Sequence, residues 1–416
     1  MRILDSSATL TRELGKICLG GRTIQEQLDN GLALLEDDYY RQLLDPARAR
    51  EWCRQTGLND GEDLLSVMRI ARAVADSQDR GSSGYMVHMD TRQSGILLLS
   101  LGMKDQTALA CIGLLDNTPS DVYSALAEAS GGLTRDEMKK AVVPYNYGGV
   151  AEARKILGPG RADLFFRVYR DMLPCPDCFR AACLEAWDPT ARSYRWTLPD
   201  HLEVVQVVEN FDRSVSASVY WEDETGRRNS VKVCPNLPGC LPRGSEGTRG
   251  IGANLTHSLD AYILRELVRR CGRNQTYRRR FSTLVPVPDG SDRVSFSSSR
   301  AADIFSSYRA TGMASLRILE FTEDGDCLPR KYHQALGEAV RALPDSEFDV
   351  VTVHDEFMCR FDHAQDLRNC FSRLMLELYR GSLFSYFAGV FGMDLLMGTP
   401  APAMEERILE YDYFLS

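Results

Sequence analysis

The clearest structural signal in the chain lies at Val87–Asp105, which reads Val-His-Met-Asp-Thr-Arg-Gln-Ser-Gly-Ile-Leu-Leu-Leu-Ser-Leu-Gly-Met-Lys-Asp. The apolar run Tyr85–Met89 predicts a buried strand that ends at the carboxylate of Asp90. A polar turn over residues 91–95 follows, and the apolar run that begins at Ile96 predicts a packed helix. A carboxylate at the end of a strand is well placed to hold a cation.

A second acidic strand end lies far downstream, at Phe348–Cys359, which reads Phe-Asp-Val-Val-Thr-Val-His-Asp-Glu-Phe-Met-Cys. His354, Asp355 and Glu356 interrupt this β-rich run, so the pattern predicts two strands with acids at the turn between them. Taken singly, acids at turns also serve solvation and local hydrogen bonding. If Asp90 and Asp355 meet in the folded protein, they form a candidate two-metal site for in-line displacement at phosphorus.

A third stretch, Thr134–Gly149, predicts a helix that Thr134 caps. Four positions of this helix recur every four residues and so share one face: Arg135, Lys139, Val143 and Tyr147. Two cations followed by an aromatic ring suit a triphosphate that lies along the helix, with the ring near its sugar and base. Pro144 lies inside the predicted helix and removes one of its backbone hydrogen bonds.

The three stretches resemble, in the same order, the polymerase motifs of the single-subunit bacteriophage and mitochondrial DNA-dependent RNA polymerases. The residues that carry the resemblance are Asp90 with Ser94-Gly95-Ile96, Arg135 and Lys139 with Tyr147-Gly148, and His354-Asp355. Further similar segments are Asp121-Val122-Tyr123, Trp196-Thr197-Leu198-Pro199-Asp200, His257-Ser258-Leu259-Asp260 and Arg407-Ile408-Leu409-Glu410-Tyr411-Asp412-Tyr413-Phe414. The resemblance covers about residues 65–271 and 346–416.

The resemblance implies an α+β fold of the right-hand polymerase type, with a small antiparallel catalytic sheet in the palm and largely helical fingers. The implied parts are an N-terminal helical region (1–80), palm with the first catalytic motif (81–118), fingers with a hairpin near 215–233 (119–257), palm (258–271), an insertion (272–345), and palm with the second catalytic aspartate and the C-terminal segment (346–416).

The resemblance also implies RNA synthesis, in which nucleotides pass from NTPs to an RNA 3′-hydroxyl on a DNA template. Asp90 and Asp355, aided by the backbone carbonyl of Thr91, are expected to bind two Mg²⁺ ions. Lys139 is expected to act on the α-phosphate, and Arg135 and Lys140 on the β- and γ-phosphates.

The remaining residues of the implied substrate site are Gly95, Tyr123, Tyr147, Gly148 and His257, of which Tyr147 and His257 sense the ribose 2′-hydroxyl and the minor groove. Glu356 departs from the family pattern, because these RNA polymerases usually have Ser there and the related DNA polymerases have Glu. Gly95 favours RNA synthesis, since the DNA polymerases place a Glu there that blocks the 2′-hydroxyl. A DNA polymerase and an inactive nucleic-acid-binding scaffold are the alternatives.

Family enzymes carry a promoter-binding domain, a thumb and an Asp-x-x-Gly-Arg segment ahead of the first motif, and none is recognisable before Asp90. We therefore expect a second protein chain to supply the thumb and N-terminal elements. The chain then looks like the larger, catalytic chain of a heterodimeric phage RNA polymerase, in the cytoplasm of an infected bacterial host. A promoter-opening or single-strand DNA-binding factor is a further partner class.

Nucleic acid must follow a local basic groove, because the formal net charge is −9. Arg227 and Arg228, at the tip of the predicted hairpin, are candidate DNA contacts, and a solvated turn is the alternative. A helix predicted to begin at His257-Ser258 leads into Arg278-Arg279-Arg280, the densest basic run and a candidate phosphate contact. Such a run is also typical of a solvated face.

Composition predicts a soluble cytoplasmic protein, with 44% hydrophobic and 26% charged residues and no stretch that suits a signal peptide or membrane span. The twelve cysteines are expected to stay reduced. Zinc would need thiolates from the set Cys175, Cys178, Cys183, Cys234 and Cys240. A single Cys-x-x-Cys is a weak signal, so zinc is not the favoured interpretation.

Overall fold

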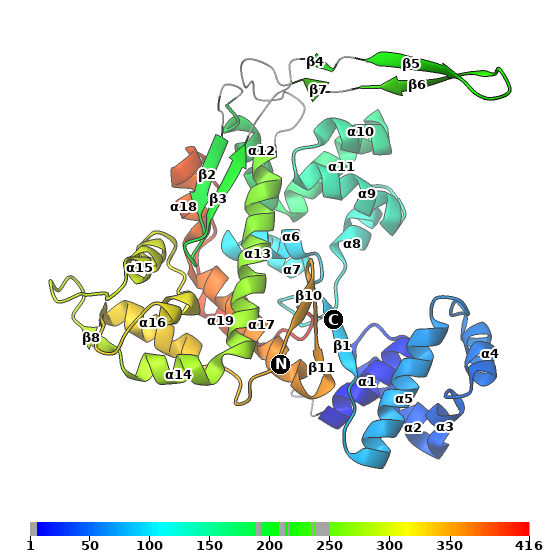
Figure 1. The fold of residues 1–416 in the computed structure, drawn as a ribbon, viewed down its shortest axis with the longest axis horizontal. Helices are drawn as coiled ribbons and strands as arrows, with labels where there is room; N and C mark the ends of the chain where they lie inside the picture. The colour runs from blue at the N-terminus through cyan, green and yellow to red at the C-terminus, as the bar shows by residue number, and fades with distance from the viewer. Residues whose placement is uncertain are drawn as a thin grey trace.

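A three-stranded antiparallel sheet lies near the middle of the protein, in strand order β1-β11-β10 (Figure 1). The computed structural model describes residues 6–188, 191, 193–207, 213–214, 216–234, 236–237 and 250–415. The sheet consists of β1 (Met86–Asp90), β10 (Val351–Val353) and β11 (Glu356–Arg360), with Asp90 opposite Glu356. Both predicted acidic strand ends are therefore confirmed, and they belong to one sheet.

Helix α6 (Ser94–Gly102) follows β1 and is buried from Ile96 onwards, as the apolar run predicted. It packs against α12 (Pro174–Glu185), α13 (Ile251–Gly272) and α17 (Ala364–Arg380). Gly102 ends the helix against Phe384, whose ring lies 2.1 Å from where a Cβ would stand. Any larger residue at position 102 would collide with the Phe384 ring.

Four helices form a block beside α6: α8 (Val122–Ala129), α9 (Arg135–Asn146), α10 (Val150–Leu157) and α11 (Pro159–Met172). The predicted cap of α9 is confirmed as a capping box, in which Thr134 accepts from the amide of Glu137 and the Glu137 carboxylate accepts from the amide of Thr134. The helix continues through Pro144 to Asn146. The short helix α7 (Gln106–Cys111) joins α6 to this block.

Helix α13 begins at Ile251, so the start predicted at His257 is wrong. Buried side chains recur every four residues from the start of the helix, at Ile251, Leu255, Leu259 and Ile263. This apolar stripe explains why the helix begins before His257. His257 thus lies well inside the helix. The arginines of α13 are engaged by acids, since Arg265 binds Asp200 at 2.9 Å and Arg270 binds Glu377 at 2.8 Å.

Residues 274–343 surround a hydrophobic cluster of their own, separate from the main core. The elements are α14 (Asn274–Ser282), β8 (Val285–Val287), α15 (Ser299–Thr311), the 3₁₀ helix η2 (Leu316–Glu320), β9 (Cys327–Pro329) and α16 (Arg330–Arg341), with β8 and β9 parallel. Glu266 of α13 fastens this part by accepting from the Ser315 hydroxyl at 2.8 Å and the Leu316 amide at 2.7 Å. That the segment is an insertion stays a prediction.

The described residues before β1 are mainly helical, as expected for the N-terminal region. The elements are α1 (Ser6–Cys18), α2 (Ile24–Leu35), η1 (Glu36–Asp38), α3 (Tyr39–Gln42), α4 (Pro46–Thr56) and α5 (Leu64–Arg80). The C-terminal part adds η3 (Phe361–His363), α18 (Leu383–Phe391) and α19 (Pro402–Glu410). Within the described ranges, none of the helices has the length and apolar character needed to cross a bilayer.

Three antiparallel pairs complete the chain: β2 (Ser193–Thr197) with β3 (Glu203–Val207), β4 (Arg213–Ser214) with β7 (Asn236–Leu237), and β5 (Ala217–Glu222) with β6 (Arg228–Val233). The β5–β6 ribbon is the predicted hairpin, and it projects from the body of the protein (Figure 1). Val215, at the edge of the predicted hairpin, lies outside the described residues. The protein is 59% helical with small, mostly antiparallel sheets, which is compatible with the predicted α+β class.

Candidate active site

Asp90 and Asp355 come from opposite parts of the chain and are joined through Thr91. The Thr91 amide and hydroxyl both donate to the backbone carbonyl of Asp355, at 3.2 and 3.1 Å. His354 has φ of 55° and turns the chain between β10 and β11, so that Asp355 faces the end of β1. The tertiary meeting that the two-metal hypothesis requires is therefore present.

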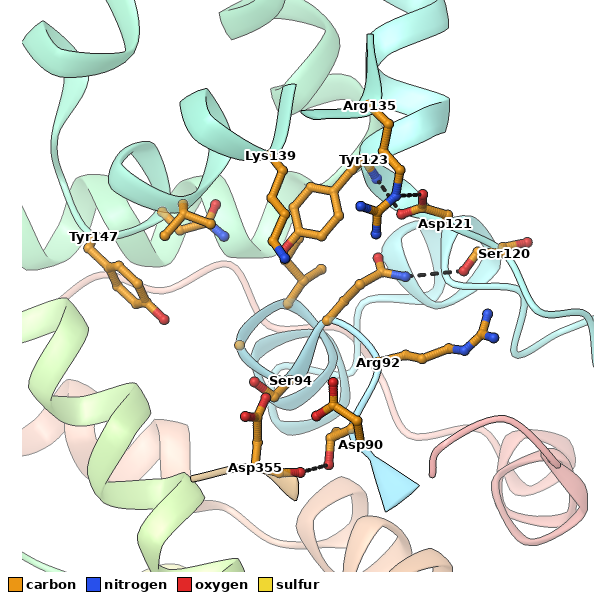
Figure 2. Close-up of a pocket in the computed structure, with 16 residues that line it drawn as sticks. Asp90, Arg92, Ser94, Ser120, Asp121, Tyr123, Arg135, Lys139, Tyr147 and Asp355 are labelled. Carbon is orange, nitrogen blue, oxygen red and sulfur yellow. Dashed lines mark hydrogen bonds and ion pairs between the residues drawn. The ribbon is translucent and has the colours of Figure 1, made fainter. Parts of the chain in front are cut away.

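A cavity of about 510 Å³ opens above the two acids. Figure 2 shows Asp90 and Asp355 at one side of it and Arg135 and Lys139 at the opposite side. The residues that line it are Asp90, Thr91, Arg92, Gln93, Ser94, Gly95, Ile96, Ser120, Asp121, Tyr123, Arg135, Lys139, Val143, Asn146, Tyr147 and Asp355. An anion between the acids and the cations would be held by the cations directly and by the acids only through a bridging cation.

The predicted row on α9 faces this cavity, because Arg135, Lys139, Val143 and Tyr147 all line it. Lys140, expected to bind phosphate, is exposed and is not among the lining residues. The Arg135 guanidinium donates to Asp121 at 2.5 Å and lies 5.6 Å from the centre of the Tyr123 ring.

The acids of the site affect each other's ionisation. Burial, and then the charges of Asp355 and Glu356, raise the pKa of Asp90 above its ordinary value. The negative charges of the two carboxylates repel each other, and a bound cation would relieve the repulsion. The donor set is all oxygen, which suits a hard cation such as Mg²⁺.

These residues fit Mg²⁺ if the protein supplies only some of the ligands of the ion. Among the residues that the structure describes, no three His, Cys, Asp or Glu side chains gather closely enough to hold a metal by themselves. Asp90 and Asp355 would supply two carboxylates, with Thr91 beside them in the lining. Mg²⁺ is commonly held in this way, by one or two carboxylates together with water and substrate phosphates.

A second cavity of about 700 Å³ shares Gly95, Tyr147 and Asp355 with the first and adds His257 and Asp260 from α13. The Tyr147 and His257 rings lie 5.3 Å apart. A Cβ on Gly95 would stand 3.4 Å from the Tyr147 hydroxyl, so a longer side chain at position 95 would displace that ring. Burial, followed by the charge of Asp355, raises the pKa of Asp260 to about 6.

Gly148 shapes the chain at the end of α9 rather than lining either cavity. Its φ is +93°, a left-handed conformation that favours glycine, and a Cβ there would stand 2.9 Å from a methyl carbon of Leu184. Its structural role is to turn the backbone directly after Tyr147.

The candidate nucleic-acid contacts lie apart from the cavity. Arg227 and Arg228 are exposed on the β5–β6 ribbon, where Arg228 covers the Tyr220 ring at 5.5 Å. In the basic run, Arg278 donates to the backbone carbonyl of Leu343 at 2.6 Å and Arg280 pairs with Asp324 at 3.0 Å. Only Arg279 of this run makes no side-chain hydrogen bond or ion pair among the described residues.

The cysteines that could bind zinc differ in burial. Burial raises the pKa of both Cys175 and Cys183 to about 12, which disfavours the thiolate form that zinc needs. Cys178 is half-buried and Cys234 is exposed, while Cys240 lies outside the described residues.

Four lining residues were not predicted as site residues: Arg92, Gln93, Ser120 and Asn146. Gln93 connects the turn after β1 to the start of α8, because its amide donates to the Ser120 carbonyl and accepts from the Val122 amide, each at 3.1 Å. Asn146 lies three residues after Val143 on the cavity face of α9. The helical spacing could have revealed Asn146, whereas the bridge made by Gln93 depends on tertiary structure.

Comparisons with known proteins identify no relative: no family model matches this chain, and no curated protein matches it. Function is therefore inferred from the residues and the geometry described above.

Proposed function

We propose that this chain is the catalytic subunit of a DNA-dependent RNA polymerase of the single-subunit phage type. One observation carries the proposal: two acids from distant parts of the chain share a cavity with the cations of α9. The small antiparallel sheet that holds the acids supports a palm, and the helical block α8–α11 supports fingers. DNA, RNA and NTPs are the proposed ligands, in the cytoplasm of an infected bacterium.

The proposed reaction joins the RNA 3′-oxygen to the α-phosphorus of an NTP and releases pyrophosphate. Asp90 and Asp355 would hold two Mg²⁺ ions, which when bound supply the Lewis acidity that activates the 3′-hydroxyl and stabilises the leaving pyrophosphate. Without a cation the two carboxylates repel an approaching triphosphate, so these residues alone would hinder substrate binding.

The cations of α9 would act on the triphosphate itself. Lys139 neutralises charge that develops on the α-phosphate and donates a proton to the leaving pyrophosphate. The Arg135 guanidinium donates hydrogen bonds to the β- and γ-phosphates. Asp121 fixes this guanidinium at the cavity wall. Lys140 would contribute only longer-range charge, since it does not line the cavity.

Gly95 and Tyr147 support ribonucleotide rather than deoxyribonucleotide use. Gly95 leaves the space beside the Tyr147 hydroxyl open for a 2′-hydroxyl. Glu356 is the residue that departs from the RNA polymerase pattern and matches the DNA polymerases. It does not line either cavity, and its carboxylate lies 2.7 Å from the His88 ring nitrogen.

A second chain is part of the proposal, because a polymerase must grip template and hybrid through many additions. We propose that it supplies a thumb and N-terminal elements and docks on α1–α5. Processive synthesis by the purified chain alone, at the rate of the native enzyme, would contradict this part.

Extension of a primed DNA template with NTPs or with dNTPs tests the function. The proposal predicts ribonucleotide incorporation that depends on Asp90 and Asp355. Preferential incorporation of dNTPs would identify a DNA polymerase, and template binding without incorporation would identify a scaffold. Either result would overturn the proposal.

A further inference from the structure

Asn146 brings an amide into the cavity that the proposed mechanism does not use. It is the last residue of α9 and lines the cavity directly beside Tyr147. With Lys139 and Val143 it lies on one face of the helix, at the end away from the cations. A nucleotide whose phosphates lay along Arg135 and Lys139 would bring its nucleoside half toward this end of the helix.

A hydrogen bond from a buried tyrosine fixes the orientation of the Asn146 side-chain amide. The hydroxyl of Tyr169 donates a hydrogen bond to Oδ1 of Asn146. Tyr169 has no exposed surface, and its ring packs edge-on against Tyr145 at 4.9 Å and against Phe165 at 5.7 Å. Burial raises the pKa of Tyr169 well above its ordinary value, so the hydroxyl keeps its proton and remains a donor.

The other end of the amide is left available. Because Oδ1 faces Tyr169, the two hydrogens of Nδ2 remain, and among the described residues they make no hydrogen bond. The Asn146 side chain is half-buried, and its Oδ1 atom is held by Tyr169. Its Nδ2 group can therefore donate two hydrogen bonds to a ligand in the cavity.

We propose that Asn146 is a substrate-binding residue, whose Nδ2 donates to an acceptor on the nucleoside half of the incoming nucleotide. Tyr169 is a positioning residue that fixes the amide. The inference rests on the proposed function, because the ligand is the nucleotide of that reaction. The acceptor is either the ribose 2′-oxygen or an acceptor atom of the base.

Single-nucleotide extension of a primed scaffold by the full chain tests the inference. Asn146→Asp keeps an oxygen for the Tyr169 hydroxyl but removes both donors, and should raise the KM for NTP about tenfold with kcat changed less than about threefold. Tyr169→Phe should raise KM about threefold, and should add nothing in an Asn146→Ala background.

The matched control is Tyr145→Phe, which removes a buried hydroxyl that donates to Asp177 at 2.8 Å and does not line the cavity. It should leave KM unchanged even if it lowers the melting temperature. An increase in KM for Asn146→Asp that disappears with dNTPs would identify the 2′-oxygen, and one that persists would identify the base.

Two results would overturn the inference while the proposed function stood: an unchanged KM for Asn146→Asp in a chain that extends primers, or a full effect of Tyr169→Phe in the Asn146→Ala background. Failure of the unaltered chain to extend any primer would instead count against the proposed function.

Discussion

Thr91 holds the backbone of Asp355 with two hydrogen bonds, from its amide at 3.2 Å and from its hydroxyl at 3.1 Å. This contact links the residue after the first acid to the backbone of the second acid. Because both bonds go to the main chain, the carboxylate of Asp355 stays available to a ligand. The geometry of the acid pair is thus built into the sheet.

Replacement of either acid should abolish nucleotide addition and leave the fold intact. Asp90→Asn or Asp355→Asn removes a charge needed to hold Mg²⁺, so extension should fall more than about a hundredfold. Mg²⁺ should also raise the melting temperature of the unaltered protein and not of either variant.

The matched control for these variants is Asp163→Asn, since the Asp163 side chain is 62% exposed and does not line the cavity. It should retain both extension and the response to Mg²⁺. Extension above about a hundredth of the normal rate in Asp90→Asn or Asp355→Asn would refute the two-metal assignment.

Lys139 and Lys140 form a natural pair for comparison, because they are neighbours and only Lys139 lines the cavity. Lys139→Met should lower kcat more than about tenfold through lost charge stabilisation at the α-phosphate. Lys140→Met should change kcat less than about threefold. Single-turnover extension at saturating NTP measures both, and equal losses would show that position in the cavity does not govern their roles.

Sugar selection should depend on Gly95 and Tyr147. Gly95→Glu should suppress ribonucleotide incorporation, because its side chain would occupy the space beside the Tyr147 hydroxyl. Tyr147→Phe should relax discrimination against dNTPs. Gly95→Ala is the control, since its Cβ fits at 3.4 Å. Identical ribo-to-deoxy ratios in all four proteins would place selection elsewhere.

Asp260 should make the metal-free protein less stable as the pH rises. Its folded pKa of about 6 exceeds its ordinary value of 3.8, so between these values the folded state binds more protons than the unfolded state. The free energy of unfolding should therefore fall from about pH 4 to about pH 6 by at most about 3 kcal/mol and then level off.

Asp260→Asn should remove this dependence. In EDTA its melting temperature should exceed that of the unaltered protein at pH 7 and match it near pH 4. Asp345→Asn, at a fully exposed side chain, is the control and should not show this pattern. A variant that is no more stable than the unaltered protein at pH 7 would contradict the raised pKa of Asp260, which burial and then the charge of Asp355 cause.

Local signals predicted the individual elements well, because they depend on neighbours in sequence. The strand ending at Asp90, the turn at Asp355 and the Thr134 cap each follow from short patterns. Helix α13 begins earlier than the predicted start at His257, because a four-residue period of buried side chains begins at Ile251.

Contacts between distant segments could not be predicted from such patterns. The hydrogen bonds from Thr91 to Asp355 and from Tyr169 to Asn146 join residues that have no sequence relationship. Similarly, the basic run at residues 278–280 was a candidate phosphate contact, whereas the Leu343 carbonyl engages Arg278 and Asp324 engages Arg280 in the folded protein. Tertiary packing determines which charged side chains remain available to a ligand.

The most direct test of the polymerase proposal is the release of pyrophosphate during addition of one ribonucleotide to an RNA primer annealed to a DNA template. One addition on a preassembled scaffold needs no sustained grip, so the full chain should perform it even if a partner is required for long products. The account predicts one pyrophosphate per nucleotide added, dependence on Mg²⁺, and loss of both signals in Asp355→Asn. Template-directed addition that Asp355→Asn leaves unaffected, or no addition by the unaltered chain with or without a partner, would contradict it.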